Sequence, residues 1–407
     1  MTRKEILQDV LAIPNRNILL ELATGTGKSK IALDVLNSKL PLGKILIVVP
    51  RLVLIQNWKD EFIKWGYEKY LPQVEFVTYV SLPKKVGEQY ALKIIDEAHH
   101  LSERCLQAVP YIKSEYNILL SATIKRTLRP NLNRLFPKLY IYKISLVDAI
   151  ENEILPEPRI VLIPLKLETT QLTELYEINP KKPYQKTITY YQWLKGKWQY
   201  LRGNFNYGVK IQCTQAQKYK EMCDFMDNCT KKLQNNLVSG MNRVMVEQAR
   251  KRKGLERLQW LAEIKSDFVK QLLKQLKDYR TLTFCYNTKQ ADNLCKNSIH
   301  SKNKKSAQIL EAFNNKKIKH ISAIDCLTEG INLAECKVLV FAKLDASLIK
   351  QVQKLGRGLR HKSPIFMLPY YENTREEQIV NEMISGYDDS LIVKVTNPFN
   401  FNEYINR

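Results

Sequence analysis

The sequence predicts an α/β protein with two parallel-sheet lobes and a basic, mostly helical insertion between them. Three observations lead to this fold class: short apolar runs alternate with helix-length segments over residues 1–148, the same alternation returns over 279–407, and the rhythm is lost between them. Continuous apolar runs indicate strands buried on both faces, as in parallel sheets covered by helices. We therefore expect a first lobe at 1–148, a linker and insertion at 149–278, and a second lobe at 279–407.

Nine apolar runs are the expected strands. Those of the first lobe are NILLEL (17–22), KILIVV (44–49), VEFVTYV (74–80), LKIIDEA (92–98) and YNILLSAT (116–123). Those of the second lobe are TLTFCY (281–286), IKHISAI (318–324), KVLVFA (337–342) and PIFMLPY (364–370). The run IVLIPLKL (160–167) could be one more strand, whereas residues 175–278 lack strand rhythm and predict mostly helix.

The charge of the chain favours nucleic acid as a partner. Lys and Arg total 64 against 41 Asp and Glu, a formal net charge of +23 over 407 residues. Such a surplus suits a polyanion, either nucleic acid or an anionic membrane. The start, MTRKEILQDV, is too charged for a signal-peptide core, and runs such as ILIVV (45–49) are too short to span a bilayer. We therefore expect no membrane partner.

The cysteines indicate a reducing compartment. Eight are scattered along the chain without a CxxC pair and with few histidines nearby. This pattern argues against a zinc module or a disulfide scaffold and is typical of reduced thiols. We expect a cytoplasmic protein.

The segment ATGTGKS (23–29) has the composition of a phosphate-binding loop. It lies between an expected strand and an expected helix, where backbone N–H groups can surround phosphate. Lys28 is expected to reach the β and γ phosphates of ATP, and Ser29 to bind Mg²⁺. The alternative is a plain turn, and Ala23 stands where the usual pattern has another Gly. The remaining phosphate-binding positions are Thr24, Gly25, Thr26 and Gly27.

The segment IIDEAHH (94–100) places two carboxylates at a strand tip. Beside a phosphate loop, Asp96 can hold Mg²⁺ through water, and Glu97 can polarise the attacking water. By itself such a pair is usually a solvated strand end. Its position after the phosphate loop favours the catalytic interpretation.

Together these motifs resemble the superfamily 2 helicases that carry a DEAH box. The resemblance implies two RecA-like lobes with ATP and Mg²⁺ in the cleft between them. SAT (121–123) matches the family's motif three, in which Ser121 and Thr123 are expected to link the nucleotide state to nucleic-acid binding through His99.

Two further segments of the first lobe resemble nucleic-acid contacts of this family. VVPRLVLIQNW (48–58) resembles motif Ia, with Arg51 where many members have Thr, and TYVSL (78–82) resembles motif Ib. Both would place backbone amides and short side chains along a phosphate backbone. The alternative for each is an ordinary loop at a strand end. The expected contacts are Pro50, Arg51, Thr78 and Ser81.

In the second lobe, CLTEGINL (326–333) resembles motif V. Gly330 would let the backbone approach the nucleotide, Asn332 stands where relatives contact the ribose, and Thr328 would face nucleic acid. TLTFCYNTKQA (281–291) fits the less specific motif IV region.

QKLGRGLR (353–360) fits motif six, Q-x-x-G-R-x-x-R. Arg357 and Arg360 lie on one helix face and would stabilise charge on the transferring phosphate across the cleft, with Gln353 beside them. Near the start of the chain, Arg3 and Gln8 could form the adenine-reading element, or they could be ordinary helix surface.

The insertion interleaves aromatic and basic residues over 181–210, and QARKRKGLERLQW (248–260) is densely basic. Tyr191, Trp193 and Trp198 could stack on bases while cations follow the phosphates. Alternatively, the aromatic residues form the insertion's own core and the basic stretch is a solvated helix face.

The sequence thus predicts a sequence-independent, ATP-dependent helicase or translocase that opens or remodels forked or branched nucleic acid. We favour DNA, because the motifs resemble repair-type DNA helicases, including UvrW-like phage enzymes. An RNA helicase is the alternative, as is a duplex-DNA motor subunit of a larger restriction, defence or repair complex without unwinding activity. A monomer is compatible with the sequence.

Overall fold

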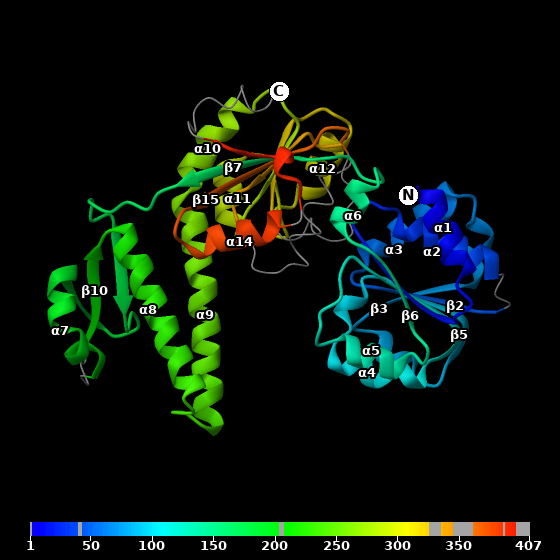
Figure 1. Ribbon diagram of the computed structural model, residues 1–407, viewed down its shortest axis with the longest axis horizontal. Coiled ribbons are helices and arrows are strands. Elements are labelled where there is room, and N and C mark those ends of the chain that lie inside the picture. The colour runs from blue at the N-terminus through cyan, green and yellow to red at the C-terminus, as the bar shows by residue number, and fades with distance from the viewer. Residues whose placement is uncertain are drawn as a thin grey trace.

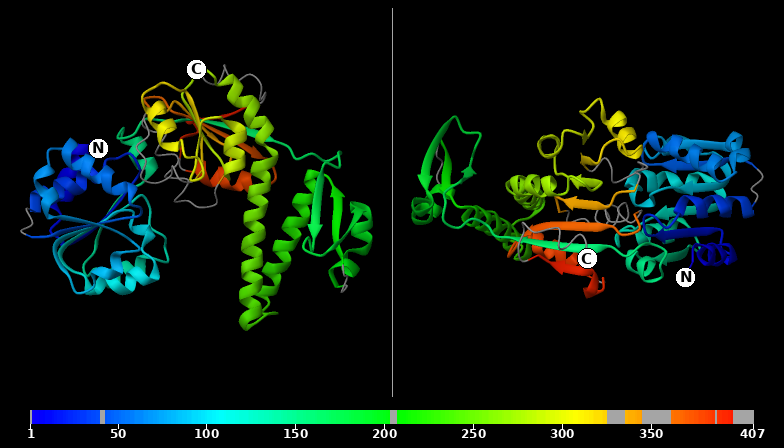
Figure 2. Two further views of the ribbon diagram at one scale, coloured as in Figure 1. Left: turned by 180° about the vertical axis from the view of Figure 1, so that it is seen from behind. Right: turned by 90° about the horizontal axis from the view of Figure 1, so that it is seen from above.

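The computed structural model describes residues 2–39, 43–202, 207–324, 335–344, 361–385 and 387–395. It contains a six-stranded sheet, a seven-stranded sheet and a three-stranded sheet (Figure 1). The lobe with the seven-stranded sheet lies between the other two parts in every view (Figures 1 and 2). The predicted fold class of two parallel-sheet α/β lobes is confirmed.

The first sheet has the order β3-β2-β4-β5-β1-β6, and its paired strands are all parallel. The predicted runs all form strands, and one more strand follows them. The strands are β1 (Asn17–Leu22), β2 (Ile45–Val49), β3 (Val74–Thr78), β4 (Gln89–Ile95), β5 (Lys113–Ser121) and β6 (Tyr140–Ile144). Because the strands are parallel, the loops after β1, β2, β3, β4 and β5 all leave the same edge of the sheet.

Helices cover both faces of this sheet, which explains why its strands are apolar on both sides. One apolar cluster joins the sheet to α1 (Arg3–Ala12), α2 (Lys28–Lys39) and α3 (Val53–Lys64). Another joins the opposite face to α4 (Glu103–Ala108) and α5 (Arg129–Leu135). Short 3₁₀ helices occupy the connections: η1 (Glu68–Gln73), η2 (Leu82–Lys85), η3 (Ala98–His100) and η4 (Val109–Tyr111).

The second sheet has the order β12-β13-β11-β14-β15-β7-β16, again with parallel pairing. Its strands are β7 (Arg159–Leu165), β11 (Thr281–Phe284), β12 (Ser298–Ile299), β13 (His320–Ala323), β14 (Val338–Phe341), β15 (Ile365–Tyr371) and β16 (Ile392–Lys394). Its helices are α10 (Ser266–Gln275), α11 (Thr288–Leu294), α12 (Ser306–Asn314) and α14 (Arg375–Ile384), with η6 (Asp389–Leu391) before the last strand.

The lobe with the second sheet begins earlier in the chain than the expected boundary. β7, which falls in the segment that we assigned to the linker, pairs with β15 over seven residues from Arg159 to Leu165. The short helix α6 (Leu146–Glu151) leads into it from the first lobe. The remainder of the assigned insertion, between β7 and α10, is therefore inserted into the second lobe after its first strand.

The insertion contains a sheet that the sequence analysis missed. The strands β8 (Glu174–Ile178), β9 (Tyr184–Thr189) and β10 (Tyr207–Cys213) form a sheet with the order β8-β10-β9. The expectation that 175–278 lacks strands is wrong for this part. β9 buries only Ile188, so no apolar run marks it. The helix α7 (Tyr190–Arg202) connects β9 to β10, which lie parallel.

The rest of the insertion is helical, as predicted. α8 (Gln215–Gln234) and α9 (Gly240–Ile264) pack against each other as a hairpin that leads away from the second lobe (Figure 2). At the base of the hairpin, between α9 and α10, the buried Lys265 ammonium lies 2.5 Å from the carboxylate of Glu376 in α14. It also donates to the backbone oxygen of Pro369 over 3.0 Å. This ion pair joins the hairpin to the second lobe.

Candidate nucleotide site and nucleic-acid interface

A pocket of about 740 Å³ lies at the edge of the first sheet where its strands end. The phosphate loop, α3 and the acidic pair line it, together with Pro156, His361 and Lys362. His361 and Lys362 directly follow the motif-six segment in the chain. The pocket therefore has walls from both halves of the protein. A larger cavity of about 1100 Å³ lies within the insertion, away from the motifs that carry phosphate chemistry.

The phosphate loop has the conformation that its glycines allow. Gly25 and Gly27 both have a φ of 96°, which side chains other than glycine rarely adopt. The Thr26 hydroxyl donates to the Ala23 oxygen over 2.8 Å, and the Lys28 ammonium donates to the Leu22 oxygen over 3.2 Å. Because α2 begins at Lys28, the N–H groups of its first turn lie at the pocket, where anions bind helices.

The acidic pair follows β4 at the same edge. The Asp96 N–H donates to the Val48 oxygen of β2 over 2.9 Å, and the Trp58 indole Nε1–H donates to Oδ2 of Asp96 over 2.9 Å. Burial raises the pKa of Asp96 and the Glu97 carboxylate raises it further, whereas the Trp58 N–H and the Lys28 ammonium oppose this rise. A cation bound beside Asp96 would stabilise the charged form of this carboxylate, which burial and Glu97 disfavour. Thus Asp96, Lys28 and Ser29 line one pocket with the chemistry to hold a metal-bound phosphate.

Glu97 occupies a left-handed backbone conformation, with a φ of 52°. Within the part of the chain that the structure describes, no donor bonds to its carboxylate Oε2. This oxygen lies 3.4 Å from Nδ1 of His99, and the two form an ion pair only when His99 is protonated. Conformations of this kind in residues other than glycine often occur at functional sites. The carboxylate lines the pocket together with Asp96 and Lys28.

The predicted coupling residues lie together. Nδ1 of His99 lies 3.1 Å from Oγ of Ser121, and the Ser121 hydroxyl donates to the Thr123 oxygen over 2.8 Å. The same loop is tied to β1, since the buried Glu21 carboxylate accepts from the Ile124 N–H over 3.3 Å. The motif-three segment is thus connected both to the acidic pair and to the strand before the phosphate loop.

The structure separates the two residues of the expected adenine-reading element. Arg3 lines the pocket, and its guanidinium donates to the Gly25 oxygen over 3.2 Å. Gln8 is exposed on α1 and is not among the residues that line the pocket. The prediction for Gln8 is not supported by this geometry because, five residues further along α1, its side chain leaves the helix in another direction.

Trp58 and Tyr79 bond to the acidic pair and are not among the predicted site residues. The Tyr79 hydroxyl donates to the backbone oxygens of Asp96, at 2.6 Å, and Glu97, at 3.1 Å. Trp58 recurs at helical spacing with the buried Leu54 and Phe62, so its pattern indicates core rather than a polar contact. The only signal in the sequence is the residue type, because a buried Trp or Tyr usually finds an acceptor for its N–H or O–H.

The expected nucleic-acid contacts of the first lobe lie beyond two neighbouring strands. Pro50 and Arg51 follow β2, and Thr78 and Ser81 lie at and beyond the end of β3. The Thr78 and Ser81 hydroxyl oxygens are 3.4 Å apart, and the Ser81 N–H donates to the Thr78 oxygen over 2.9 Å. Arg51 is exposed. The structure therefore brings the four residues to one edge of the sheet.

In the insertion, the structure divides the three aromatic candidates. Tyr191 and Trp198 are each 63% exposed on α7, whereas Trp193 is 1% exposed and packs in the insertion's core. The prediction that Trp193 stacks on bases is wrong in this conformation, because the face of α7 that carries it covers the unexpected sheet. The alternative of an aromatic core thus holds for Trp193.

Six predicted site residues lie outside the described residues: Thr328, Gly330, Asn332, Gln353, Arg357 and Arg360. Across the described ranges, no helix combines the length and the apolar character needed to cross a membrane.

Comparisons with known proteins agree with this architecture. Residues 3–126 match the family described as "Type III restriction enzyme, res subunit", and residues 264–362 match "Helicase conserved C-terminal domain". A protein of Invertebrate iridescent virus 6 named "Putative helicase 161L" is 30% identical over 159 residues, which are 34% of this chain and 35% of that protein. The chain thus matches about a third of the length of that curated relative.

Two solved structures share the fold at low sequence identity. S. cerevisiae Dbp5 bound to RNA and ADP BeF3 has a TM-score of 0.58 and 11% identity, covering 99% of this chain and 91% of that chain. A fragment of a "putative HsdR subunit of a type I restriction enzyme" from Vibrio vulnificus YJ016 has a TM-score of 0.54 and 15% identity. The match covers 97% of this chain and 67% of that chain. Both show the same pair of parallel-sheet lobes.

Proposed function

The chain belongs to the superfamily 2 helicases, and from that premise we propose that it is an ATP-driven helicase or translocase acting on DNA. The observation that carries this proposal is the pocket that unites Lys28, Ser29, Asp96 and Glu97 with His361 and Lys362. A nucleotide in a pocket walled by both lobes would couple hydrolysis to their closure and opening.

The roles of the pocket residues follow from their chemistry. Lys28 and the N–H groups of the phosphate loop would bind the phosphates, and Ser29 and Asp96 would hold Mg²⁺, which supplies charge neutralisation at the transferring phosphate. Glu97 would accept a proton from the attacking water. Gly330 and Asn332 would contact the nucleotide, and Arg357 and Arg360, with Gln353, would complete the site from the second lobe.

Nucleic acid would lie along the edge formed by Pro50, Arg51, Thr78 and Ser81, and continue to Thr328 in the second lobe. These are contacts to a phosphate backbone, which carry no sequence information and weaken with salt. The formal net charge of +23 supports such a partner.

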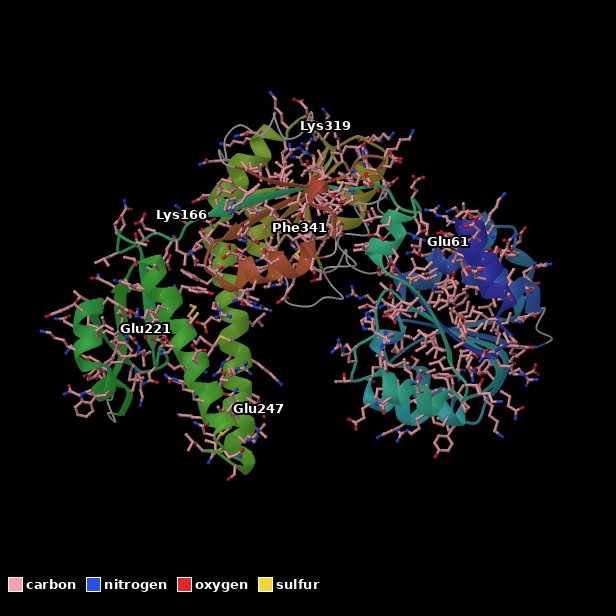
Figure 3. The ribbon with its side chains drawn as sticks, viewed as in Figure 1. Glu61, Lys166, Glu221, Glu247, Lys319 and Phe341 are labelled. Atoms are coloured by element: carbon pink, nitrogen blue, oxygen red, sulfur yellow. The ribbon has the colours of Figure 1, made fainter. Side chains whose placement is uncertain are left out.

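The insertion would extend this track. Tyr191 and Trp198 offer exposed rings for base stacking. In the adjoining cavity, acidic side chains such as Glu221 (Figure 3) are engaged by lysines, with Lys197 2.9 Å from the Glu221 carboxylate. Arg252, on α9, lines the same cavity. We therefore assign to the insertion, which runs from the end of β7 to the start of α10, an accessory role in nucleic-acid binding.

A motor subunit of a restriction-type complex is the second candidate. The match of residues 3–126 to the restriction-enzyme family and the likeness to the HsdR fragment favour it. In that case the isolated chain would hydrolyse ATP only after a partner protein binds to it. Gel filtration with candidate partners separates this function from that of an active monomer.

The test is ATP hydrolysis by the purified chain, titrated separately with single-stranded DNA, duplex DNA, forked DNA and RNA. We expect stimulation by DNA, strongest with forks, and none in Lys28→Ala, which controls for contaminating ATPases. Stimulation mainly by RNA would make the chain an RNA helicase. A lack of stimulation by every polymer would overturn the helicase proposal in favour of the motor subunit.

A further inference from the structure

Two aromatic side chains hold the acidic pair from outside its own strand. Trp58 lies in α3 and Tyr79 directly follows β3, and both side chains are buried. Each belongs to a segment with a proposed nucleic-acid contact, because Arg51 precedes α3 and Thr78 precedes Tyr79. The two side chains therefore form a physical connection between the proposed nucleic-acid edge and the nucleotide pocket.

Trp58 orients the side chain of Asp96. Its indole N–H donates to Oδ2 of Asp96 over 2.9 Å. The ring is 3% exposed and packs against Phe62, one turn further along α3, with ring centroids 6.4 Å apart. A ring held in this way presents its single donor in one direction. Because Trp58 lies in the second turn of α3, any movement of the N-terminus of that helix moves the donor.

Tyr79 holds the backbone of the same pair. Its hydroxyl lies 2.6 Å from the Asp96 oxygen and 3.1 Å from the Glu97 oxygen, so one O–H spans both peptide groups. Glu97 has the left-handed conformation described above, which persists only where the surroundings impose it. The Tyr79 backbone oxygen is itself bound by the Cys105 thiol over 3.3 Å.

We infer that Trp58 and Tyr79 are positioning residues through which nucleic-acid binding sets the geometry of Asp96 and Glu97. This inference rests on the proposed function. Phosphates bound beside Arg51 and Thr78 order the start of α3 and the end of β3. The Trp58 N–H then fixes the rotation of the Asp96 carboxylate, and the Tyr79 O–H fixes the turn that aims Glu97 at the water. Both residues act through the acidic pair, to which their side chains donate.

The experiment compares Trp58→Phe and Tyr79→Phe in the full chain, each of which removes one donor and keeps an aromatic ring. Trp260→Phe and Tyr70→Phe are matched controls. Trp260 is a buried indole bonded to Glu174 over 3.0 Å, and Tyr70 is a buried phenol bonded to Asn37 over 2.9 Å, both away from the acidic pair. The readouts are the half-saturating Mg²⁺ concentration, the stimulation of kcat by single-stranded DNA, DNA affinity without nucleotide, and the melting temperature.

We expect Trp58→Phe to raise the half-saturating Mg²⁺ concentration about 10-fold, the scale of a lost hydrogen bond to a charged group. Both test variants should lose stimulation about 10-fold while DNA affinity stays at the wild-type value. The controls should keep the wild-type Mg²⁺ dependence, stimulation and DNA affinity, even where the loss of a buried hydrogen bond lowers their melting temperature. If Trp58→Phe lowers the melting temperature, replacement of Trp58 by 3-benzothienylalanine removes the N–H with the ring shape retained and should reproduce the effect.

Wild-type stimulation and Mg²⁺ dependence in both test variants would overturn the inference, as would equal losses in the two controls. A change confined to DNA affinity would also overturn it, since positioning acts after binding. These outcomes differ from failure of the proposed function, in which the wild-type chain itself shows no polymer-stimulated hydrolysis or Lys28→Ala retains it.

Discussion

Nδ1 of His99, in η3, lies 3.1 Å from Oγ of Ser121, the last residue of β5. His99 follows the acidic pair, and Ser121 ends β5, whose last residues lie beside β1. One hydrogen bond therefore connects the loop that carries Asp96 and Glu97 to the motif-three segment. β5 also pairs with β4, the strand that precedes the acidic pair, so the two segments are neighbours in the sheet as well.

We predict that Ser121→Ala uncouples the two activities of the chain. Loss of the hydroxyl removes the contacts to His99 and to the Thr123 oxygen, whereas the phosphate loop and the acidic pair remain in place. DNA-stimulated ATP hydrolysis should stay within about 3-fold of wild type, and strand separation per ATP should fall about 10-fold, the scale of one hydrogen bond. Hydrolysis and fork-unwinding assays run in parallel give the number of base pairs opened per ATP. A proportional loss of both activities would contradict the predicted uncoupling.

Glu97→Gln should abolish hydrolysis while ATP binding and the fold persist. The amide keeps the shape of the side chain but cannot accept a proton, and removal of a general base typically lowers kcat by about 10²–10⁴-fold. Equilibrium binding of a fluorescent ATP analogue and a thermal melt are the controls. Full turnover by a preparation free of wild-type protein would show that another group activates the water.

Arg3→Ala should weaken nucleotide binding, and Gln8→Ala should not. Arg3 lines the pocket and donates to the Gly25 oxygen, so its loss loosens the phosphate loop, whereas Gln8 is exposed on the same helix. We expect the Kd of the ATP analogue to rise about 10-fold in Arg3→Ala, for the loss of one hydrogen bond from a charged group. An equal rise in Kd for both substitutions would indicate that the stability of α1, rather than the hydrogen bond from Arg3, supports nucleotide binding.

In the insertion, Trp198→Ala should weaken DNA binding without a change in stability. The exposed ring is free to stack, and one stacked base contributes about 1–3 kcal/mol. Trp193→Ala should instead destabilise the insertion by about 3–5 kcal/mol, because it leaves a cavity in a packed core. Fluorescence anisotropy with single-stranded DNA and thermal unfolding distinguish the two effects. A DNA affinity of Trp198→Ala equal to that of wild type would show that this ring does not contact the DNA.

Lys265→Met should lower the free energy of unfolding by about 3–5 kcal/mol, because it leaves Glu376 buried without its partner. Burial lowers the pKa of Lys265 and raises that of Glu376, and each group opposes the shift of the other. The double variant Lys265→Met with Glu376→Leu should recover most of the loss. Lys394→Met, which breaks an exposed pair with Glu372, is the control and should change stability by less than about 1 kcal/mol. Denaturant unfolding gives all values.

The sequence by itself determined the parts of this protein whose chemistry is local. A phosphate loop needs a strand, two glycines, a lysine and a helix start in succession, and Gly25, Gly27 and Lys28 have this arrangement along a few residues of chain. The strand tip at Asp96 could be predicted for the same reason. Once parallel strands are inferred, their carboxyl ends must meet at one edge, which brings Pro50 and Thr78 together without knowledge of side-chain packing.

Only the tertiary structure decided the contacts between segments far apart in the chain. Trp58 and Asp96 are 38 residues apart. The helical spacing of apolar residues around Trp58 predicts that its indole is buried but not which acceptor it bonds to. β7 joins the second sheet through pairing with β15, about two hundred residues later, and Trp193 is buried because α7 lies on a sheet with no apolar run in β9. Packing between distant segments depends on the whole fold, so periodicity along the chain predicts which residues are buried but not what they touch.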